Sequence, residues 1–297
     1  MYKVVVPATS ANLGPGFDCL GVALDLYNSI EVEVTGTGLK IESTSNSNYF
    51  DNEHNLIYKS MKHIFDLVGY TPKGIRIVQT DNIPGTRGLG SSAACIVAGL
   101  LAGNIITGQS FSTDEIAFMA GTIDGHPDNT TPAMYGGLRA AVLTEKKLYQ
   151  VGIETPPNLK FVAFIPDFTL STTKARMILP QLVSHNDAVF NLGRLALLVS
   201  SLSSGKFDNL AYGFEDKVHQ PYRKRFIPDF DKIFSKSMEF GARGCYLSGA
   251  GPTLMAVVDS NHDEFSENME KYIANNLKTS WTIVVLNVNN KGAEVFA

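Results

Sequence analysis

The sequence predicts an α+β protein of two lobes, and three observations carry this prediction. The chain has 297 residues, enough for one large domain or two moderate ones with proper cores. Segments with strand and helix periodicity are mixed along it without a regular βαβ repeat. A proline-rich stretch at residues 155–158 is the best candidate for a linker. We therefore expect an amino-terminal domain over residues 1–155 and a carboxy-terminal domain over residues 156–297.

The amino-terminal half combines strands with three helices. Helical spacing of apolar residues predicts a helix over residues 55–68, and an apolar run at residues 93–106 predicts a second after a glycine-rich turn. Ser112 and Glu115 form a capping box at the start of a third helix. Apolar or alternating segments predict strands at residues 4–6, 29–35, 39–43, 75–78 and 138–143, and we expect the third of these to pair with the second.

The carboxy-terminal half shows the same mixture. We expect helices at residues 173–179, 188–201 and 265–277, and a helix over residues 221–240 that is interrupted around Pro228. Strands are expected at residues 160–165 and 282–288, and two more lie within residues 245–258 on either side of the turn at 248–252. Whether the last strand stays in this lobe or returns to the first is left open.

Composition and charge exclude several classes of protein. Hydrophobic residues make up 44% and charged residues 18% of the chain, which is typical of soluble globular proteins. A net charge of −4 provides no basic field for nucleic acid. Three scattered cysteines argue against a disulfide framework, and no signal peptide or membrane-spanning run is apparent. We expect a cytoplasmic protein without a nucleic-acid or membrane partner.

The stretch PGTRGLGSSAA, residues 84–94, is the strongest functional signal. Its glycines permit positive φ and leave no Cβ to block an incoming anion. Ser91 and Ser92 stand where the next helix should begin, so they can cap it and offer hydroxyls to a phosphate or its metal. Unpaired N–H groups and the positive end of the helix dipole would then form an anion site. The loop matches neither a Walker A nor a dinucleotide-binding pattern. It predicts a site for a nucleotide triphosphate, and a plain flexible loop is the competing interpretation.

Four further segments carry polar residues that a core would not require. Asn12 and Asp18, in residues 7–18, could accept hydrogen bonds from an ammonium group, although an Asx turn explains them equally well. Residues 125–129 read GHPDN and gather three polar side chains at a helix end. Arg176 and Arg223 could each hold a carboxylate bidentately, or could be solvated surface residues. The turn SGAGP at 248–252 is either a simple hairpin or a place where another backbone segment or a ligand approaches closely.

Together these segments resemble the motifs of the GHMP superfamily of small-molecule kinases, and most closely its homoserine-phosphorylating branch. PATSANLGPGFDCLGVAL at 7–24 resembles the first family motif, RGLGSSAA at 87–94 the second, and LSGAGPT at 247–253 the third. GHPDN at 125–129, TKAR at 173–176, HQPYR at 219–223 and GAEVF at 292–296 indicate the homoserine branch. The resemblance extends over nearly the whole chain, in order.

The resemblance implies an amino-terminal lobe like ribosomal protein S5 domain 2 and a ferredoxin-like carboxy-terminal lobe. It implies transfer of the γ-phosphoryl group of ATP, with Mg²⁺, to the side-chain hydroxyl of L-homoserine, and a homodimer is compatible with it. The ATP phosphates are then expected against Pro84, Arg87, Gly88, Leu89, Gly90, Ser91, Ser92 and Ala93, with Ser92 as a magnesium ligand and Asn55 at the adenine. The amino and hydroxyl ends of homoserine are expected at Asn12, Asp18, His126 and Asp128, and its carboxylate at Thr172, Arg176 and Arg223.

One position departs from the family pattern. The resemblance implies that relatives carry a magnesium-binding glutamate where this chain has Thr122, so the expected metal and catalytic set is Ser92 with Thr122, beside Asp128. Asp124 is two residues further on, roughly 200° around a helix, and would not replace that carboxylate unless the helix has unwound. Because a hydroxyl offers magnesium less than a carboxylate does, we expect weakened metal affinity.

Three other functions remain open at this point. The chain could phosphorylate a different small alcohol, such as mevalonate or shikimate, although neither carries both an ammonium and a carboxylate group. It could be a non-catalytic nucleotide- or amino-acid-binding protein, which Thr122 alone favours. A purely structural interaction protein would leave the polar segments unexplained.

Overall fold

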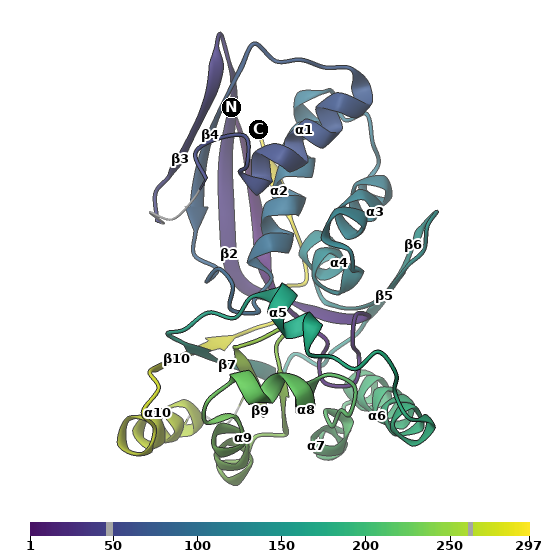
Figure 1. Cartoon of the computed structure of the whole chain (residues 1–297), viewed down its shortest axis with the longest axis vertical. Helices are drawn as coiled ribbons and strands as arrows, with labels where there is room; N and C mark the ends of the chain where they lie inside the picture. Colours follow the sequence, from purple (N-terminus) through teal and green to yellow (C-terminus); the bar gives the residue numbers. More distant parts are fainter. Residues whose placement is uncertain (46–49, 261–263) are drawn as a thin grey trace.

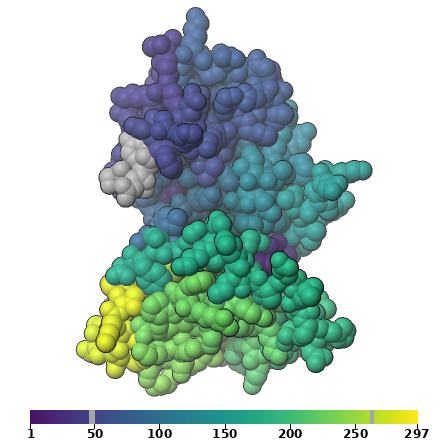
Figure 2. Space-filling model, viewed as in Figure 1, coloured from purple at the N-terminus to yellow at the C-terminus, as the bar shows by residue number. Residues whose placement is uncertain are grey.

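Two β-sheets, one in each lobe, organise the chain along its long axis (Figure 1). The structure is a computed structural model and describes residues 1–45, 50–260 and 264–297. Both chain ends lie in the amino-terminal lobe (Figure 1). The surface narrows between the lobes, and the segment around α5 lies across this narrow part (Figure 2). Among the described residues, no helix combines the length and the apolarity that crossing a membrane requires.

The amino-terminal sheet has seven strands. Its path runs β11-β1-β2-β4-β3, and β5 pairs with both β2 and β6. The strand expected at residues 39–43 forms, but it pairs in parallel with β4 and not with β2, because β1 and β4 already flank β2. The strands are β1 (Tyr2–Ala11), β2 (Leu20–Thr35), β3 (Gly38–Ser43), β4 (Gly74–Asp81), β5 (Leu138–Leu143), β6 (Leu148–Ile153) and β11 (Glu294–Phe296).

Four helices pack beside this sheet (Figure 1). They are α1 (Leu56–Val68), α2 (Ser91–Ile106), α3 (Thr113–Asp124) and α4 (Pro127–Tyr135). α2 is apolar on nearly all sides and lies in the middle of the lobe, as expected of a fully buried helix. Gly99 lets it approach α1 closely, since a Cβ there would collide with the carbonyl oxygen of Ile57. The capping box of Ser112 and Glu115 is present at the start of α3.

The carboxy-terminal lobe confirms the ferredoxin-like expectation. Its antiparallel sheet has the order β10-β7-β9-β8, and its strands and main helices follow one another as β-α-β-β-α-β. The strands are β7 (Leu159–Pro166), β8 (Gly244–Leu247), β9 (Leu254–Asp259) and β10 (Trp281–Leu286). The helices are α5 (Thr172–Met177), α6 (His185–Ser204), α7 (Leu210–Gly213), α8 (Gln220–Arg223), α9 (Phe230–Glu239) and α10 (Glu264–Asn276), with 3-10 turns η1 (Phe207–Asn209) and η2 (Lys224–Phe226).

The expected interruption around Pro228 is present. The helical segment at residues 221–240 consists of α8, η2 and α9 in succession, because the chain is extended at Ile227 and left-handed at Asp229 on either side of Pro228. The strand expected at residues 282–288 forms as β10 and pairs with β7 in this lobe, and a further strand, β11, pairs with β1 in the amino-terminal lobe.

The turn between β8 and β9 joins the two lobes through buried hydrogen bonds. The hydroxyl of Tyr246 donates to Ser10 Oγ at 3.0 Å, the Ser10 and Ser248 hydroxyls are 2.7 Å apart, and Ser248 Oγ donates to the carbonyl of Gly88 at 2.5 Å. The amide of Gly249 donates to the carbonyl of Ala11 at 3.1 Å. Close approach is therefore the role of this glycine-rich turn.

Candidate active site

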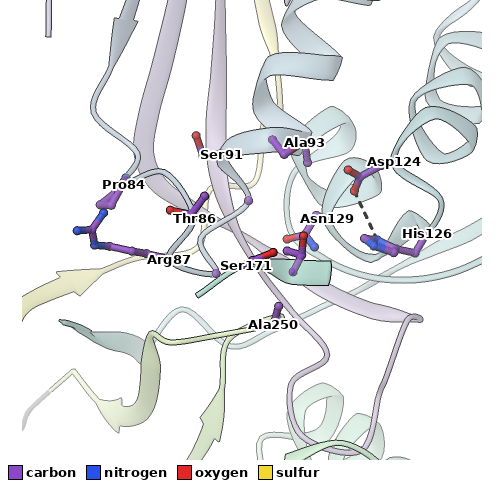
Figure 3. Close-up of a pocket in the computed structure, with 15 residues that line it drawn as sticks. Pro84, Thr86, Arg87, Ser91, Ala93, Asp124, His126, Asn129, Ser171 and Ala250 are labelled. Atoms are coloured by element: carbon purple, nitrogen blue, oxygen red, sulfur yellow. Dashed lines mark ion pairs between the residues drawn. The ribbon is translucent and has the colours of Figure 1, made fainter. Parts of the chain in front are cut away.

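A cavity of about 320 Å³ lies where the lobes meet, at the amino end of α2 (Figure 3). Its wall combines the glycine loop with the end of α3, the start of α4, the start of α5 and the β8–β9 turn. The residues that line it are Pro84, Thr86, Arg87, Gly88, Gly90, Ser91, Ser92, Ala93, Asp124, His126, Asn129, Ser171, Thr172, Gly249 and Ala250.

The loop presents unpaired backbone donors to this cavity. Gly90 is the N-cap of α2 with φ of 71°, and no side chain caps the helix. The first N–H groups of the helix, at Ser91, Ser92 and Ala93, therefore lack intrahelical acceptors and line the cavity wall. A Cβ on Gly90 would collide with the hydroxyl of Thr9, so only glycine fits here. Such a helix start attracts anions through both its N–H groups and its dipole.

Two residues of this loop serve the fold more than the cavity. Leu89 is buried in the core and is not on the cavity wall. The guanidinium of Arg87 donates to the backbone carbonyls of Pro166 and Asp167, each at 3.0 Å, and its side chain extends away from Asp124 and His126 (Figure 3). Arg87 thus holds the loop against the carboxy-terminal lobe.

Asp124 and His126 line the opposite wall, and the buried Asp128 contacts His126 but does not line the cavity. His126 Nδ1 lies 3.4 Å from Asp124 Oδ2 (Figure 3) and 3.1 Å from Asp128 Oδ1, without hydrogen-bond geometry to either. Burial raises the pKa of Asp124 to about 6, and the charge of Asp128 adds to the rise. The interaction with Asp128 raises the pKa of His126, and burial opposes this rise.

Thr122 is not part of this wall. Its side chain is exposed, and its hydroxyl donates to the carbonyl of Phe118 one turn earlier at 2.8 Å. Asp124 is the last residue of α3, and Gly125 follows in the left-handed conformation that ends the helix. The carboxylate at position 124, which we had not expected at the site, therefore lines the cavity with Ser92 while the side chain of Thr122 does not.

A second cavity, of about 520 Å³, adjoins the first. Asp124, His126 and Thr172 line both cavities, so they form a shared wall. The second cavity is completed by Gly125, Thr173, Arg176 and Met177. It thus lies between the end of α3 and the exposed face of α5.

Arg176 and Arg223 lie near each other beside the ring of Phe17. Their guanidinium carbons are 5.5 and 5.2 Å from the centre of the Phe17 ring, within the range of cation–π attraction. Arg176 forms two hydrogen bonds of 2.9 Å with Asp18, which raise the pKa of Arg176. Arg223 is buried, and burial together with the nearby charge of Arg176 lowers the pKa of Arg223 to about 10.

Arg223 is held by groups from three elements. Its Nε donates to the carbonyl of Ala175 in α5 at 3.2 Å, and its Nη1 donates to the carbonyl of Gly249 at 2.9 Å. His219 Nδ1 lies 3.3 Å from the same Nη1, and the His219 ring stacks on Phe17 at 5.2 Å. The HQPYR segment thus places Arg223 beside Arg176 and α5, as the expected carboxylate pair requires.

Two asparagines expected at the ligands are occupied within the fold. Asn12 Nδ2 donates to the carbonyl of Gly249, and its Oδ1 accepts from the amide of Asp18, so Asn12 shapes the turn that carries Asp18. Asn55 caps α1 by accepting from the amides of Ile57 and Tyr58, and its Nδ2 donates to Gln79 Oε1. Neither asparagine is among the residues that line the two cavities.

The donor set at the first cavity suits a magnesium ion that is bound mainly through nucleotide phosphates. Within the described part of the chain no group of three His, Cys, Asp or Glu residues could enclose a metal by itself. Magnesium is usually held by one or two protein oxygens together with phosphates and water. The hydroxyl of Ser92 and the carboxylate of Asp124, both on the cavity wall, are oxygen donors of this kind.

Comparison with known sequences identifies the class of protein that this fold and site define. Residues 55–137 match the family model of the GHMP kinases N terminal domain, and residues 198–275 match that of the GHMP kinases C terminal domain. These two matches cover more than half of the chain and fall one in each lobe. A mevalonate kinase structure from L. major shares the fold, with a TM-score of 0.75 at 17% identity over 97% of this chain and 96% of that one.

Relatives that match over nearly their whole length show to which family within the GHMP kinases the chain belongs. A homoserine kinase of Caldicellulosiruptor saccharolyticus is 51% identical over 100% of this chain and 97% of its own length. A homoserine kinase of Petrotoga mobilis is 48% identical over 99% of this chain and 96% of its own length. The crystal structure of homoserine kinase from Cytophaga hutchinsonii matches with a TM-score of 0.87 at 30% identity. The match covers 99% of this chain and 96% of that one. The chain therefore belongs to the homoserine kinase family of GHMP kinases.

The structure brings to the site several residues to which the sequence had assigned no individual role. Asn129 accepts from the hydroxyl of Thr9 at 2.8 Å and lines the first cavity, as do Ser171 and Ala250. Phe17 and His219 support the two arginines. Asn129, Phe17, His219 and Ala250 lie inside the quoted motifs, so their position in GHPDN, PGFD, HQPYR and SGAGP was the available signal. Ser171 carries no such signal.

Proposed function

We propose that the chain transfers the γ-phosphoryl group of ATP to the side-chain hydroxyl of L-homoserine and releases O-phospho-L-homoserine. The observation that carries the proposal is the pair of adjoining cavities, one at the unpaired amides of α2 and the other at Arg176. ATP would place its phosphates in the first cavity and homoserine would occupy the second. The shared wall of Asp124, His126 and Thr172 then stands where the two reactants meet.

Each end of homoserine has a group of matching charge nearby. Asp18 supplies a carboxylate for the ammonium group, while Arg176 and Arg223 supply guanidinium groups for the carboxylate. Mevalonate and shikimate lack the ammonium group, and this favours an amino acid over the other small alcohols. A non-catalytic binding protein is disfavoured as well. Its only support was the missing carboxylate at Thr122, and the carboxylate of Asp124 lines the phosphate cavity instead.

The chemistry rests on positioning and charge, since phosphoryl transfer has a loose transition state. The amides at the start of α2 would neutralise charge that develops on the phosphate oxygens. Magnesium held by Ser92, Asp124 and the phosphates would supply further positive charge. His126, with its raised pKa, can donate a hydrogen bond toward the phosphate or the substrate hydroxyl. Asp128 is only 3% exposed and pairs with His126, so we assign it to orienting His126 and the substrate before any role as a base.

The test is ADP release by the purified protein with Mg-ATP and one candidate acceptor at a time. L-Homoserine is compared with L-serine, mevalonate and shikimate. We expect turnover with homoserine at least tenfold faster, in kcat/KM, than with any of the others, roughly the effect of one unpaired charged contact. Equal turnover of mevalonate would show that the charged groups do not select the substrate. ATP binding without turnover of any acceptor would support the non-catalytic alternative.

A further inference from the structure

The two groups that we assign to opposite ends of the substrate bind each other in this structure. Arg176 Nη1 donates to Asp18 Oδ2 and Nη2 donates to Asp18 Oδ1, both at 2.9 Å, which is a bidentate carboxylate–guanidinium pair. The pair joins residues 158 positions apart, one in the turn before β2 and the other in α5. Each partner thus occupies the charge that the substrate would need.

Neighbouring groups keep both partners in place whether or not they are paired. Asp18 lies in a turn at φ of 57°, and its amide donates to Asn12 Oδ1. Arg176 lies in α5, whose backbone is tied to Arg223 through the carbonyl of Ala175. The ring of Phe17 lies beside both guanidinium groups. The carboxylate and the guanidinium can therefore separate by side-chain rotation alone, without displacing the turn or the helix.

Both partners are accessible to a ligand. The side chain of Asp18 is 33% exposed and that of Arg176 is 46% exposed. Arg176 lines the second cavity, so a molecule that enters there meets the Arg176 end of the pair, while Asp18 lies outside the lining of this cavity. α5 itself buries only Ala175 among its six residues and lies at the junction of the lobes (Figure 1).

We propose that the Asp18–Arg176 pair is a selectivity element that opens by ion-pair exchange with a zwitterionic substrate. This inference rests on the proposed function. The ammonium group of the substrate replaces Arg176 at Asp18, and the carboxylate of the substrate replaces Asp18 at Arg176, so two ion pairs form for the one that breaks. An alcohol with a single charge breaks the same pair but satisfies only one partner. The pair therefore acts against singly charged alcohols even where their shape fits.

The exchange makes a prediction that simple recognition does not make. In the variant Asp18→Asn, Arg176 no longer has a hydrogen-bonded carboxylate, although Asp124 and Asp128 remain nearby, so a ligand with a carboxylate alone should bind more tightly than to the unmodified protein. If Asp18 only contacts the ammonium group, that ligand should bind equally well to both proteins. Asparagine tolerates the left-handed backbone at position 18 and keeps the amide that bonds to Asn12, so the turn should persist.

The experiment is isothermal titration calorimetry with Mg²⁺ and a non-hydrolysable ATP analogue present. The ligands are L-homoserine and 4-hydroxybutanoate, which is homoserine without its amino group. We expect Asp18→Asn to lower the Kd of 4-hydroxybutanoate about three- to tenfold and to raise the Kd of homoserine about tenfold or more. An unchanged or increased Kd for 4-hydroxybutanoate would overturn the proposal.

A reciprocal variant and a control complete the design. Arg176→Gln should lower the Kd of 3-aminopropan-1-ol, which carries only the ammonium group, because Asp18 is then free to accept it. Asp66→Asn removes an exposed ion pair with Lys62 on α1 and should leave every Kd unchanged. If the unmodified protein phosphorylates homoserine but neither variant improves binding of its matched ligand, ion-pair exchange is wrong and the proposed function stands. If homoserine is not phosphorylated at all, the proposed function fails first.

Discussion

Two glycine-rich segments meet at the junction of the lobes, and they use their backbone in opposite ways. At the start of α2 the amides of residues 91–93 have no intrahelical acceptor and line a cavity. In the turn at 248–252 the amide of Gly249 and the hydroxyl of Ser248 both donate hydrogen bonds to carbonyl groups of the amino-terminal lobe. The first segment is available to an anion, whereas the second holds the lobes together.

The comparison shows that glycine content by itself does not identify a phosphate site. Both segments need glycine, the first because a Cβ on Gly90 would collide with the hydroxyl of Thr9, and the second because Gly249 and Gly251 have φ of 54° and 86°. The difference lies in whether the backbone donors already have acceptors. A helix that follows the glycines without a side-chain cap leaves its donors free, and a turn between two paired strands does not.

The largest expected effect follows from adding a side chain to the first segment, at Gly90. Gly90→Ala forces a side chain at φ of 71° into the hydroxyl of Thr9, so we expect kcat/KM for ATP to fall more than about 100-fold. Stability should fall by about 2–4 kcal/mol, measured by chemical unfolding. Gly85→Ala is the matched control, because no atom lies within 4 Å of its added Cβ. Equal losses in both variants would contradict the steric argument.

Two serines allow a crossed test of the comparison. Ser92→Ala removes a hydroxyl from the cavity wall and should weaken apparent magnesium affinity roughly 10- to 100-fold with little change in stability. Ser248→Ala interrupts the buried hydrogen bonds between the lobes and should lower the free energy of unfolding by about 1–3 kcal/mol. Titrations of activity against Mg²⁺ and urea unfolding measure the two effects. The comparison fails if Ser248→Ala changes magnesium affinity more than Ser92→Ala does.

A smaller effect should separate stability from activity at Asp124. Its pKa is raised to about 6 by burial, so the folded protein holds this proton more tightly than the unfolded chain does. Ionising Asp124 therefore lowers the free energy of unfolding. This loss is absent at pH below the ordinary carboxyl range, grows as pH rises, and is complete above about 6. Asp124→Asn should therefore raise the free energy of unfolding by about 1–3 kcal/mol at pH 8 and by much less at pH 4.5, while activity falls. Thermal unfolding at the two pH values tests this, and equal shifts at both would refute it.

The smallest effect is expected at Thr122. The weakened metal affinity expected from Thr122 would mean that Thr122→Glu lowers the magnesium concentration needed for half-maximal rate. Because the side chain at 122 is exposed and Asp124 lines the cavity instead, we now expect that concentration to change less than about twofold. A several-fold decrease would restore the original assignment and would place a metal ligand on the outer face of α3.

Local patterns carried much of the fold and of the phosphate site. The capping box at Ser112, the helix after the glycine loop and the strands around residues 248–252 formed as predicted, since each depends on backbone sterics and short-range hydrogen bonds. The parallel pairing of β3 with β4 and the return of β11 to β1 were not accessible in the same way. They depend on which strand edges remain free once the other strands have paired.

The sequence by itself determined that this chain is a two-lobed α+β protein with a helix start preceded by glycines, because steric freedom and periodicity are properties of neighbouring residues. Only the tertiary structure decided which polar side chains reach the site. It brought Asp124 and not Thr122 to the cavity, and it occupied Asn12 and Asn55 with backbone partners. It also paired Asp18 with Arg176 across the lobes. Such choices depend on where a helix ends and on which distant donor meets which acceptor, and packing over the whole chain sets both.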